Sequence, residues 1–271
     1  MTEHLNWFTL LLNKWFGPAV LSLLKALHIT PEHPSHPIPN HVAMAILVAL
    51  IASLFFLWLR PRISADRPGA AQQIAEFLLT NPMRVGIRDL LEDSIDHDPD
   101  RYVPMVGSIA LFILFSNSIS VFPTLDSPTG NPSVPLACAI LTFLYYNWAG
   151  LRGHGILGYA KHFAGPVWWL SWLIFPVEIV SHTARLLSLT VRLWANIFAS
   201  ELIYLIFLGL LMSPVQQLAV AHPVLGVIAA VFPAILPVAF ILLHLFVSVV
   251  QAFVFTILPA IYIGMATAEE H

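Results

Sequence analysis

The chain has 271 residues, of which 58% are hydrophobic and only 10% are charged, and its formal net charge is −3. Soluble domains carry about 25% charged residues, so this composition excludes an ordinary soluble protein and indicates an all-α membrane protein with several spanning helices. The small net charge identifies no partner, and a nucleic-acid partner is not expected. The single Cys138 lies in an apolar run, so no disulfide framework is expected.

The first 41 residues are predicted to form an interfacial segment on the outer, periplasmic side of the membrane. Residues 5–28 are apolar but are interrupted by Gly17-Pro18 and carry two lysines. That pattern predicts a helix lying in the interface, with a spanning helix as the alternative. The proline-rich loop that follows is predicted to be solvated and to bind no metal, although it contains His33, His36 and His41.

Three apolar stretches fit single membrane crossings of about 20 residues each. They are residues 42–59, about 103–122 and about 134–151. Between the first two lies a segment, 70–95, that mixes charged residues with leucines at helical spacing. We predict that this segment forms an amphipathic helix on the membrane surface.

Two further apolar regions, about 167–212 and about 223–267, are too long for one ordinary crossing. A helix of ~45 residues would measure about 67 Å, against a hydrocarbon core of ~30 Å. Each region is therefore a broken hairpin or one steeply tilted helix. A pair of extra crossings is the other alternative, and the lack of a loop-like break within 182–211 argues against it. The predicted fold has about five transmembrane helices in a single domain, residues 42–268.

Positively charged residues predict the orientation, because cytoplasmic loops carry an excess of lysine and arginine. With five spans, nearly all of these residues fall on one side, and only Lys14 and Lys25 oppose them. The N-terminus is therefore predicted to face outward and the C-terminus the cytoplasm of a bacterial inner membrane. The residues on the predicted cytoplasmic side are Arg60, Arg62, Arg67, Arg84, Arg88, Arg101, Arg152 and Lys161.

Polar residues form a stripe along the first long region. At about 100° per residue they share one narrow helix face over about six turns. Lipid does not tolerate such a row, so this face is predicted to be hydrated or to contact a partner. Glu201 falls about 140° from Glu178, off the stripe. In the second long region, His244, Ser248 and Gln251 also share a face. The polar stripe comprises Glu178, His182, Arg185, Arg192, Asn196 and Ser200.

Arg192 is the most informative of these residues, because a guanidinium cannot escape burial by losing its proton. Its cost at the centre of a membrane helix is roughly 2.5–3.5 kcal/mol, which makes a site on an ion path the default hypothesis. A structural role would require a carboxylate partner. Glu178 lies 14 residues away and Glu201 points to another face, so a carboxylate on another subunit is favoured. For His182 and His244, simple pairing within the bundle remains an alternative.

The segment LSLTVRLWANIFASELI resembles the signature of subunit a of rotary F-type ATP synthases, roughly L-S-L-x-x-R-L-x-x-N-x-x-A-G-E. The similarity continues through PVEIVSHTARLLSL, LLHLFVSVVQAFVFTILPAIYI and FILFSNSISVFPTLDSPTGN, and covers about residues 40–268. Two positions depart from the family pattern. Ser200 stands where glycine is usual, and Ser120 stands where glycine or an acid is common. Both departures are expected to lie apart from the ion-handling residues.

The resemblance implies a non-catalytic, proton-translocating stator subunit of the membrane sector, with two offset half-channels beside a ring of c subunits. Arg192 would face this ring, favour the ionised form of the ring carboxylate opposite it and block proton leakage between the half-channels. Implied partners are the c-subunit ring, the b subunits of the peripheral stalk, the rest of the ATP synthase complex and the lipid membrane. Neither a cofactor nor a metal is implied.

The resemblance also implies roles for single residues. Glu201, His244 and Gln251 would line the outer half-channel, and Glu178, His182 and Arg185 would line the inner one. Asn196 would orient the guanidinium of Arg192 or the ring carboxylate. Beside Arg192, Leu189 and Asn196 are expected to lie on the surface that meets the ring, and Leu187 and Trp194 to face away from it.

Two other functions stay open at this stage. A secondary transporter that binds an anionic substrate through Arg192 would be expected to show internal repeats and broken helices, and the sequence shows neither. A purely structural subunit of a respiratory complex is the second alternative. A neighbouring gene for a two-helix protein with a central carboxylate would decide for the ring. Protons are favoured over sodium, because His182 and His244 can titrate near neutral pH.

Overall fold

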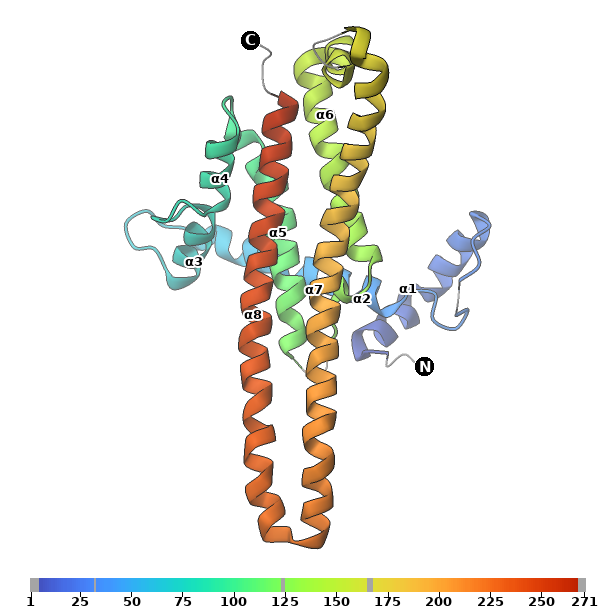
Figure 1. Cartoon of the computed structure of the whole chain (residues 1–271), viewed down its shortest axis with the longest axis vertical. Helices are drawn as coiled ribbons and strands as arrows, with labels where there is room; N and C mark the ends of the chain where they lie inside the picture. The colour runs from blue at the N-terminus through green and yellow to red at the C-terminus, as the bar shows by residue number, and fades with distance from the viewer. Residues whose placement is uncertain (1–4, 32, 123–124, 165–167, 268–271) are drawn as a thin grey trace.

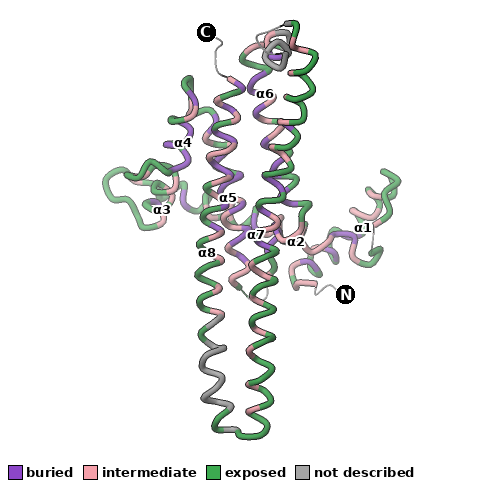
Figure 2. Tube along the Cα trace, viewed as in Figure 1, coloured by how far each residue is buried: buried purple, intermediate pink, exposed green. Residues whose placement is uncertain are grey.

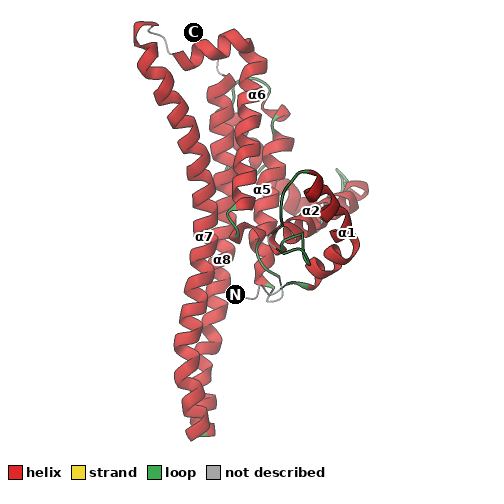
Figure 3. Cartoon of the chain, turned by 90° about the vertical axis from the view of Figure 1, so that its right-hand side faces the viewer, coloured by secondary structure: helices red, strands yellow, loops and turns green. Residues whose placement is uncertain are grey.

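The computed structural model describes residues 5–31, 33–122, 125–164 and 168–267 of the chain. Every regular element in these ranges is a helix (Figure 3). The predicted all-α class is therefore confirmed. Ala268, the predicted last residue of the transmembrane domain, and the acidic end 269–271 lie outside the described residues.

Two very long helices form an antiparallel hairpin that determines the shape of the molecule (Figure 1). Helix α7 runs over Ser171–Ala221, 51 residues, and α8 over Pro223–Thr267, 45 residues. Neither long region is a broken hairpin or a pair of crossings. At 1.5 Å per residue α7 is about 76 Å long, so it fits a hydrocarbon core of ~30 Å only at a tilt of about 65°.

The three shorter predicted spans also form helices. Helix α2 covers Asn40–Leu59, and α5 covers Val103–Ser118 before a 3-10 turn, η3, at Ile119–Val121. Helix α6 covers Ser133–Ala164 and so continues beyond the predicted end near residue 151, with a kink at Gly155, where φ is 71°. Helices α5 and α6 run alongside the hairpin, whereas α2 crosses behind α5 and α8 (Figure 1).

The N-terminal segment forms one helix, α1, over Trp7–Ala26. It runs through Gly17-Pro18, so the helix continues where the apolar pattern is interrupted. Its buried face is tied to the start of α2, because the Asn13 side chain accepts a hydrogen bond from the Ile38 N–H and donates one to the Ile38 carbonyl. By length and composition six described helices could cross a membrane, namely the five predicted spans and α1.

The predicted surface helix over 70–95 is wrong as a single element. It is divided into α3, Ala70–Leu79, and α4, Ile87–Ser94. The division falls at Asn81-Pro82, because the residue before a proline disfavours helical backbone angles. The Asn81 side chain instead accepts hydrogen bonds from the N–H groups of Met83 and Val85 and so stabilises a turn.

The first turn of α4 closes this corner. The Asp89 carboxylate accepts hydrogen bonds from the N–H groups of Asn81 and Gly86, at 2.9 and 3.2 Å. A side chain at Gly86 would overlap the carbonyl of Leu79, so only glycine permits the close approach of the two helices. Both helices are amphipathic, as predicted for this segment, but the chain changes direction between α3 and α4.

Burial is concentrated at one end of the hairpin. There α5, α6, α7 and α8 pack together, whereas the far half of the hairpin is mostly exposed wherever its burial is described (Figure 2). The exposed half carries many large apolar side chains, a surface far more apolar than that of a soluble monomer. It is suited to lipid or to a partner. Examples are Leu202, Ile206, Phe207, Leu210, Leu242 and Phe246.

Candidate functional site

Arg192 lies near the middle of α7, on the surface of the chain. Its nearest hydrogen-bonding group among the described residues is the hydroxyl of Ser188, 3.5 Å from Nη2. No described carboxylate lies within ion-pairing distance of it.

The packed face of α7 runs directly beside Arg192. Leu189, Leu193 and Ile197 are fully buried in a cluster with residues of α5, α6 and α8. Asn196 is exposed, like Arg192. The expectation that Leu189 shares the open surface is wrong, since only 2% of it is exposed. It sits about 60° around the helix from Arg192, which is enough to turn it into the core.

Three exposed residues on the side of α7 that carries Arg192 are small, although the exposed Leu187, Val191 and Phe198 nearby are large. Ala184, Ser188 and Ala199 lie on this open side of the helix. Small residues allow another helix to approach the backbone closely inside a membrane. On the side predicted to face away from the ring, Leu187 is exposed and Trp194 is half-buried. Helix α7 is therefore open on that side too.

Three residues form a hydrogen-bonded group on the side of Arg192 toward the start of α7. His182 is buried, and its Nε2 lies 3.1 Å from the Glu178 carboxylate. Its Nδ1 lies 2.7 Å from the hydroxyl of Tyr146, which comes from α6. Arg185 stacks over the ring of Tyr262 from α8, at 5.2 Å. The structure therefore brings Glu178, His182 and Arg185 to one end of the packed bundle. We call Glu178, His182 and Tyr146 the inner triad.

A second polar group surrounds His244 on the other side of Arg192, where α7, α8 and the end of α5 meet. His244 Nε2 lies 2.8 Å from the carbonyl of Asn117 and 2.9 Å from the hydroxyl of Ser120. Its Nδ1 lies 3.2 Å from the hydroxyl of Ser200. Residues from three helices thus converge on one imidazole ring. We call His244, Asn117, Ser120 and Ser200 the His244 group.

This arrangement corrects one expectation from the sequence. Ser120 and Ser200, the two departures from the family pattern, both contact His244. They lie 80 positions apart in the sequence, so only the packing of α5, α7 and α8 reveals that they meet. The two departures therefore belong to the candidate site.

Glu201 lies close to the His244 group but makes no hydrogen bond or ion pair with a described residue. A Cβ atom at Gly130 would lie 3.6 Å from one of its carboxylate oxygens. Gly130 ends a 3-10 turn, η4, at Pro128–Gly130, so the loop after α5 covers this carboxylate. Gln251 is buried on α8, and its Oε1 has no hydrogen-bond partner among the described residues. No hydrogen bond joins Glu201 directly to His244.

Polar side chains from the loop extend the His244 group. The Thr129 hydroxyl donates to the side-chain oxygen of Asn117, and the Ser127 hydroxyl bonds both Thr129 and the carbonyl of Ser116. The same loop is held from outside, because Asp126 accepts hydrogen bonds from the side chains of Asn6 and Asn40. Sequence reasoning missed Asn117 and Tyr146. The signal that could have identified them is the presence of a polar or hydroxyl-bearing residue inside an otherwise apolar span.

The polar stripe therefore does not form one continuous environment. His182 is turned into α6, Ser200 is turned toward α8, and Arg192 and Asn196 remain open between them. Arg192 thus separates two polar groups on the same helix pair. Both groups contain an imidazole.

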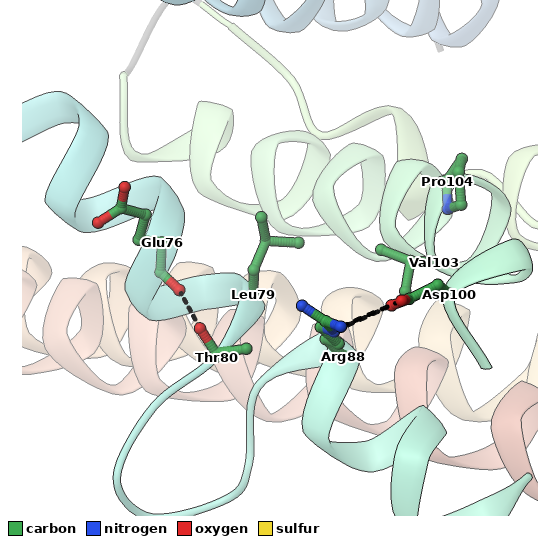
Figure 4. Close-up of a pocket in the computed structure, with 7 residues that line it drawn as sticks. All are labelled: Glu76, Leu79, Thr80, Arg88, Asp100, Val103 and Pro104. Carbon is green, nitrogen blue, oxygen red and sulfur yellow. Dashed lines mark hydrogen bonds and ion pairs between the residues drawn. The ribbon is translucent and has the colours of Figure 1, made fainter. Parts of the chain in front are cut away.

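A pocket lies elsewhere, between α3, α4 and the start of α5. It measures about 310 Å³, and Arg88 pairs with Asp100 at one side of it, at 2.9 Å. Figure 4 shows the Glu76 carboxylate pointing away from Arg88. The pocket lies at the corner between the two surface helices and contains none of the predicted site residues.

Known proteins resemble this chain over most of its length. The family model described as ATP synthase A chain matches residues 42–264. The chain is 40% identical over 268 residues to ATP synthase subunit a of Koribacter versatilis (strain Ellin345), covering 99% of each. It is 39% identical to ATP synthase subunit a of Solibacter usitatus (strain Ellin6076), covering 90% of this chain and 92% of the relative. It is 34% identical to ATP synthase subunit a of Helicobacter hepaticus (strain ATCC 51449 / 3B1), covering 86% and 94%.

Proposed function

The chain belongs to the ATP synthase A chain family, and we propose that it forms two proton half-channels against a c-subunit ring in the membrane sector of an F-type ATP synthase. In this role it couples proton flow to rotation of the ring and to ATP synthesis, and catalyses no reaction itself. Protons, rather than sodium ions, are the proposed cargo.

The position of Arg192 carries this proposal. It is a permanent cation on the open face of a membrane helix, among small residues, with no carboxylate of the described chain beside it. A buried cation in a membrane requires a partner. A carboxylate on a neighbouring helix that approaches over Ala184, Ser188 and Ala199 supplies one.

The two polar groups on either side of Arg192 are the proposed half-channels. The inner triad, with Arg185, lines the cytoplasmic one. Glu201, the His244 group and Gln251 line the outer one, where the unpaired, buried Gln251 oxygen would otherwise be costly. The guanidinium favours the ionised ring carboxylate opposite it and prevents a proton from passing directly between the half-channels. Asn196 lies one turn from Arg192 and helps to orient the ion pair.

The same proposal assigns partners and location. The open face of α7 contacts the c-subunit ring, and the b subunits of the peripheral stalk hold the chain stationary. The protein lies in a bacterial inner membrane, with its N-terminus outside and its C-terminus in the cytoplasm. Residues 1–41 form the outer segment, and residues 42–268 form one transmembrane domain.

Proton pumping in inverted membrane vesicles tests this function. Arg192→Ala should abolish ATP-driven pumping, because the ring carboxylate can then take up a proton again without net rotation. Arg192→Lys should fail as well, since an ammonium group has a shorter reach and can lose its proton when buried. Ser213→Ala, at an exposed site on the same helix, is the matched control. Normal coupled pumping by either arginine variant would refute the proposal.

A further inference from the structure

We propose that Tyr146, together with a small cavity beside it, passes protons between His182 and the neighbourhood of Arg192. This inference rests on the proposed function and adds one residue to its inner half-channel. The Glu178 carboxylate sets the position of the proton on the His182 ring, and Tyr146 serves the other ring nitrogen as the relay.

The inner triad leads from the surface into the bundle. The Glu178 side chain is 32% exposed, whereas the His182 side chain is 11% exposed. Tyr146 is buried and belongs to a core cluster formed by α4, α5, α6 and α8. The distances between successive groups are 3.1 and 2.7 Å, so each pair is within hydrogen-bonding range. Neighbouring members of the inner triad are therefore close enough to exchange a proton.

A cavity continues from Tyr146 toward Arg192. It measures about 10 Å³, close to the space that one water molecule requires. Tyr146, Arg185 and Leu189 are among the residues that line it. Leu189 precedes Arg192 by about one helical turn, so along α7 the cavity lies between His182 and Arg192.

Hydrogen-bonding roles in the triad follow from its acceptors. An ionised Glu178 can only accept, so the neutral His182 ring carries its proton on Nε2. Its Nδ1 then accepts a hydrogen bond from the Tyr146 hydroxyl. In the transfer, the Tyr146 hydroxyl gives its proton to Nδ1 while its oxygen takes a proton from a water in the cavity, and the protonated His182 gives its Nε2 proton to the Glu178 carboxylate. Nδ1 then donates to the Tyr146 oxygen, so each transfer reverses this hydrogen bond, and pumping runs the same steps in the opposite direction.

Other titratable or charged groups surround the triad and influence its proton occupancy. Arg185 lies on α7 one turn beyond His182 and stacks on Tyr262 of α8. On α6, the hydroxyl of Tyr159 donates to Asn147, at 2.9 Å. Tyr102, at the start of α5, belongs to the same buried cluster as Tyr146. None of these groups lies between the Tyr146 hydroxyl and the ring of His182, so removing that hydroxyl breaks the chain at one point.

The test uses the whole ATP synthase in inverted vesicles, where the external pH is the pH on the cytoplasmic side. Tyr146→Phe should slow ATP-driven pumping by about tenfold at neutral pH. The midpoint of the pH dependence should move toward lower pH, because a protonated His182 loses a charge-assisted hydrogen bond. Rates are divided by the ATPase rate of the detergent-uncoupled enzyme. Tyr145→Phe is the matched control, since Tyr145 is adjacent and its hydroxyl bonds no described residue.

The wild-type protein provides a second measurement that requires no assembled variant. Nitrogen NMR of labelled histidine should show neutral His182 protonated at Nε2, with the signal assigned by its loss in His182→Gln. A neutral ring protonated at Nδ1 would overturn the proposal, as would wild-type pumping and pH dependence in Tyr146→Phe. If either of these results is obtained and Arg192→Ala is still inactive, only the relay through Tyr146 is refuted. Normal pumping by Arg192→Ala would instead remove the proposed function itself.

Discussion

Substitution of Ser200 tests the most unexpected contact in the structure, because this serine touches His244 although glycine is usual at its position in the family. The hydroxyl serves two proton states of the ring. It can donate to Nδ1 of a neutral His244, or accept from Nδ1 of a protonated one while donating to the Ile197 carbonyl, 2.8 Å away. On the other side of the ring, the Asn117 carbonyl accepts from Nε2 in both states. Ser200→Ala removes a hydrogen-bond partner from both the neutral and the protonated His244 ring, but it does not destabilise the two states equally.

The expected magnitude follows from these two hydrogen bonds. A neutral hydrogen bond contributes about 1 kcal/mol and one to a charged group about 1.5–3 kcal/mol. The protonated state therefore loses roughly 1 kcal/mol more than the neutral state, which corresponds to about a fivefold lower population of protonated His244. If protons pass through this state, the rate of proton-driven ATP synthesis should fall by about fivefold in Ser200→Ala. Ser200→Thr keeps the hydroxyl and should stay near the wild-type rate.

The assay is ATP synthesis driven by an imposed proton gradient in reconstituted vesicles, with the pH on the outer side varied and that on the cytoplasmic side held constant. The Ser200→Ala defect should be largest where the outer side is least acidic, because there the protonated state of His244 is scarcest. Equal rates for Ser200→Ala and wild type at every outer pH would show that His244 does not depend on this hydroxyl. Equal defects in the Ala and Thr variants would point to packing instead.

The remaining predictions concern the outer carboxylate and the open face of α7. Glu201→Gln should slow pumping strongly with little loss of assembled complex, because an amide keeps the shape but cannot titrate; wild-type pumping would contradict its role in the outer half-channel. With Cys138 replaced by serine, a cysteine that replaces Asn196 should form a disulfide with a cysteine placed near the ring carboxylate. A cysteine that replaces the buried Leu189 should not. Equal cross-linking at both positions would exclude a packed surface between α7 and the ring.

Several features could be predicted from the sequence because they depend on local properties. Apolar length and helical spacing located α2, α5 and the two long helices to within a few residues, apart from the nine residues by which α7 extends past its predicted end. A single charged residue in an apolar run identified Arg192, since the cost of burying a guanidinium does not depend on the fold. Polar residues at helical spacing likewise indicated Glu178, His182 and His244 as candidates.

Tertiary structure decided how these residues are grouped. Helical angles alone placed Leu189 beside Arg192, but the packing of α5, α6 and α8 against α7 buried it. The partners of the two imidazoles, Tyr146 and Ser120, lie on other helices, 36 and 124 positions away in the sequence. No local pattern encodes such distances, because they depend on how four helices pack together. The sequence by itself thus determined which residues are costly to bury, and the packing of the helices determined which of them meet.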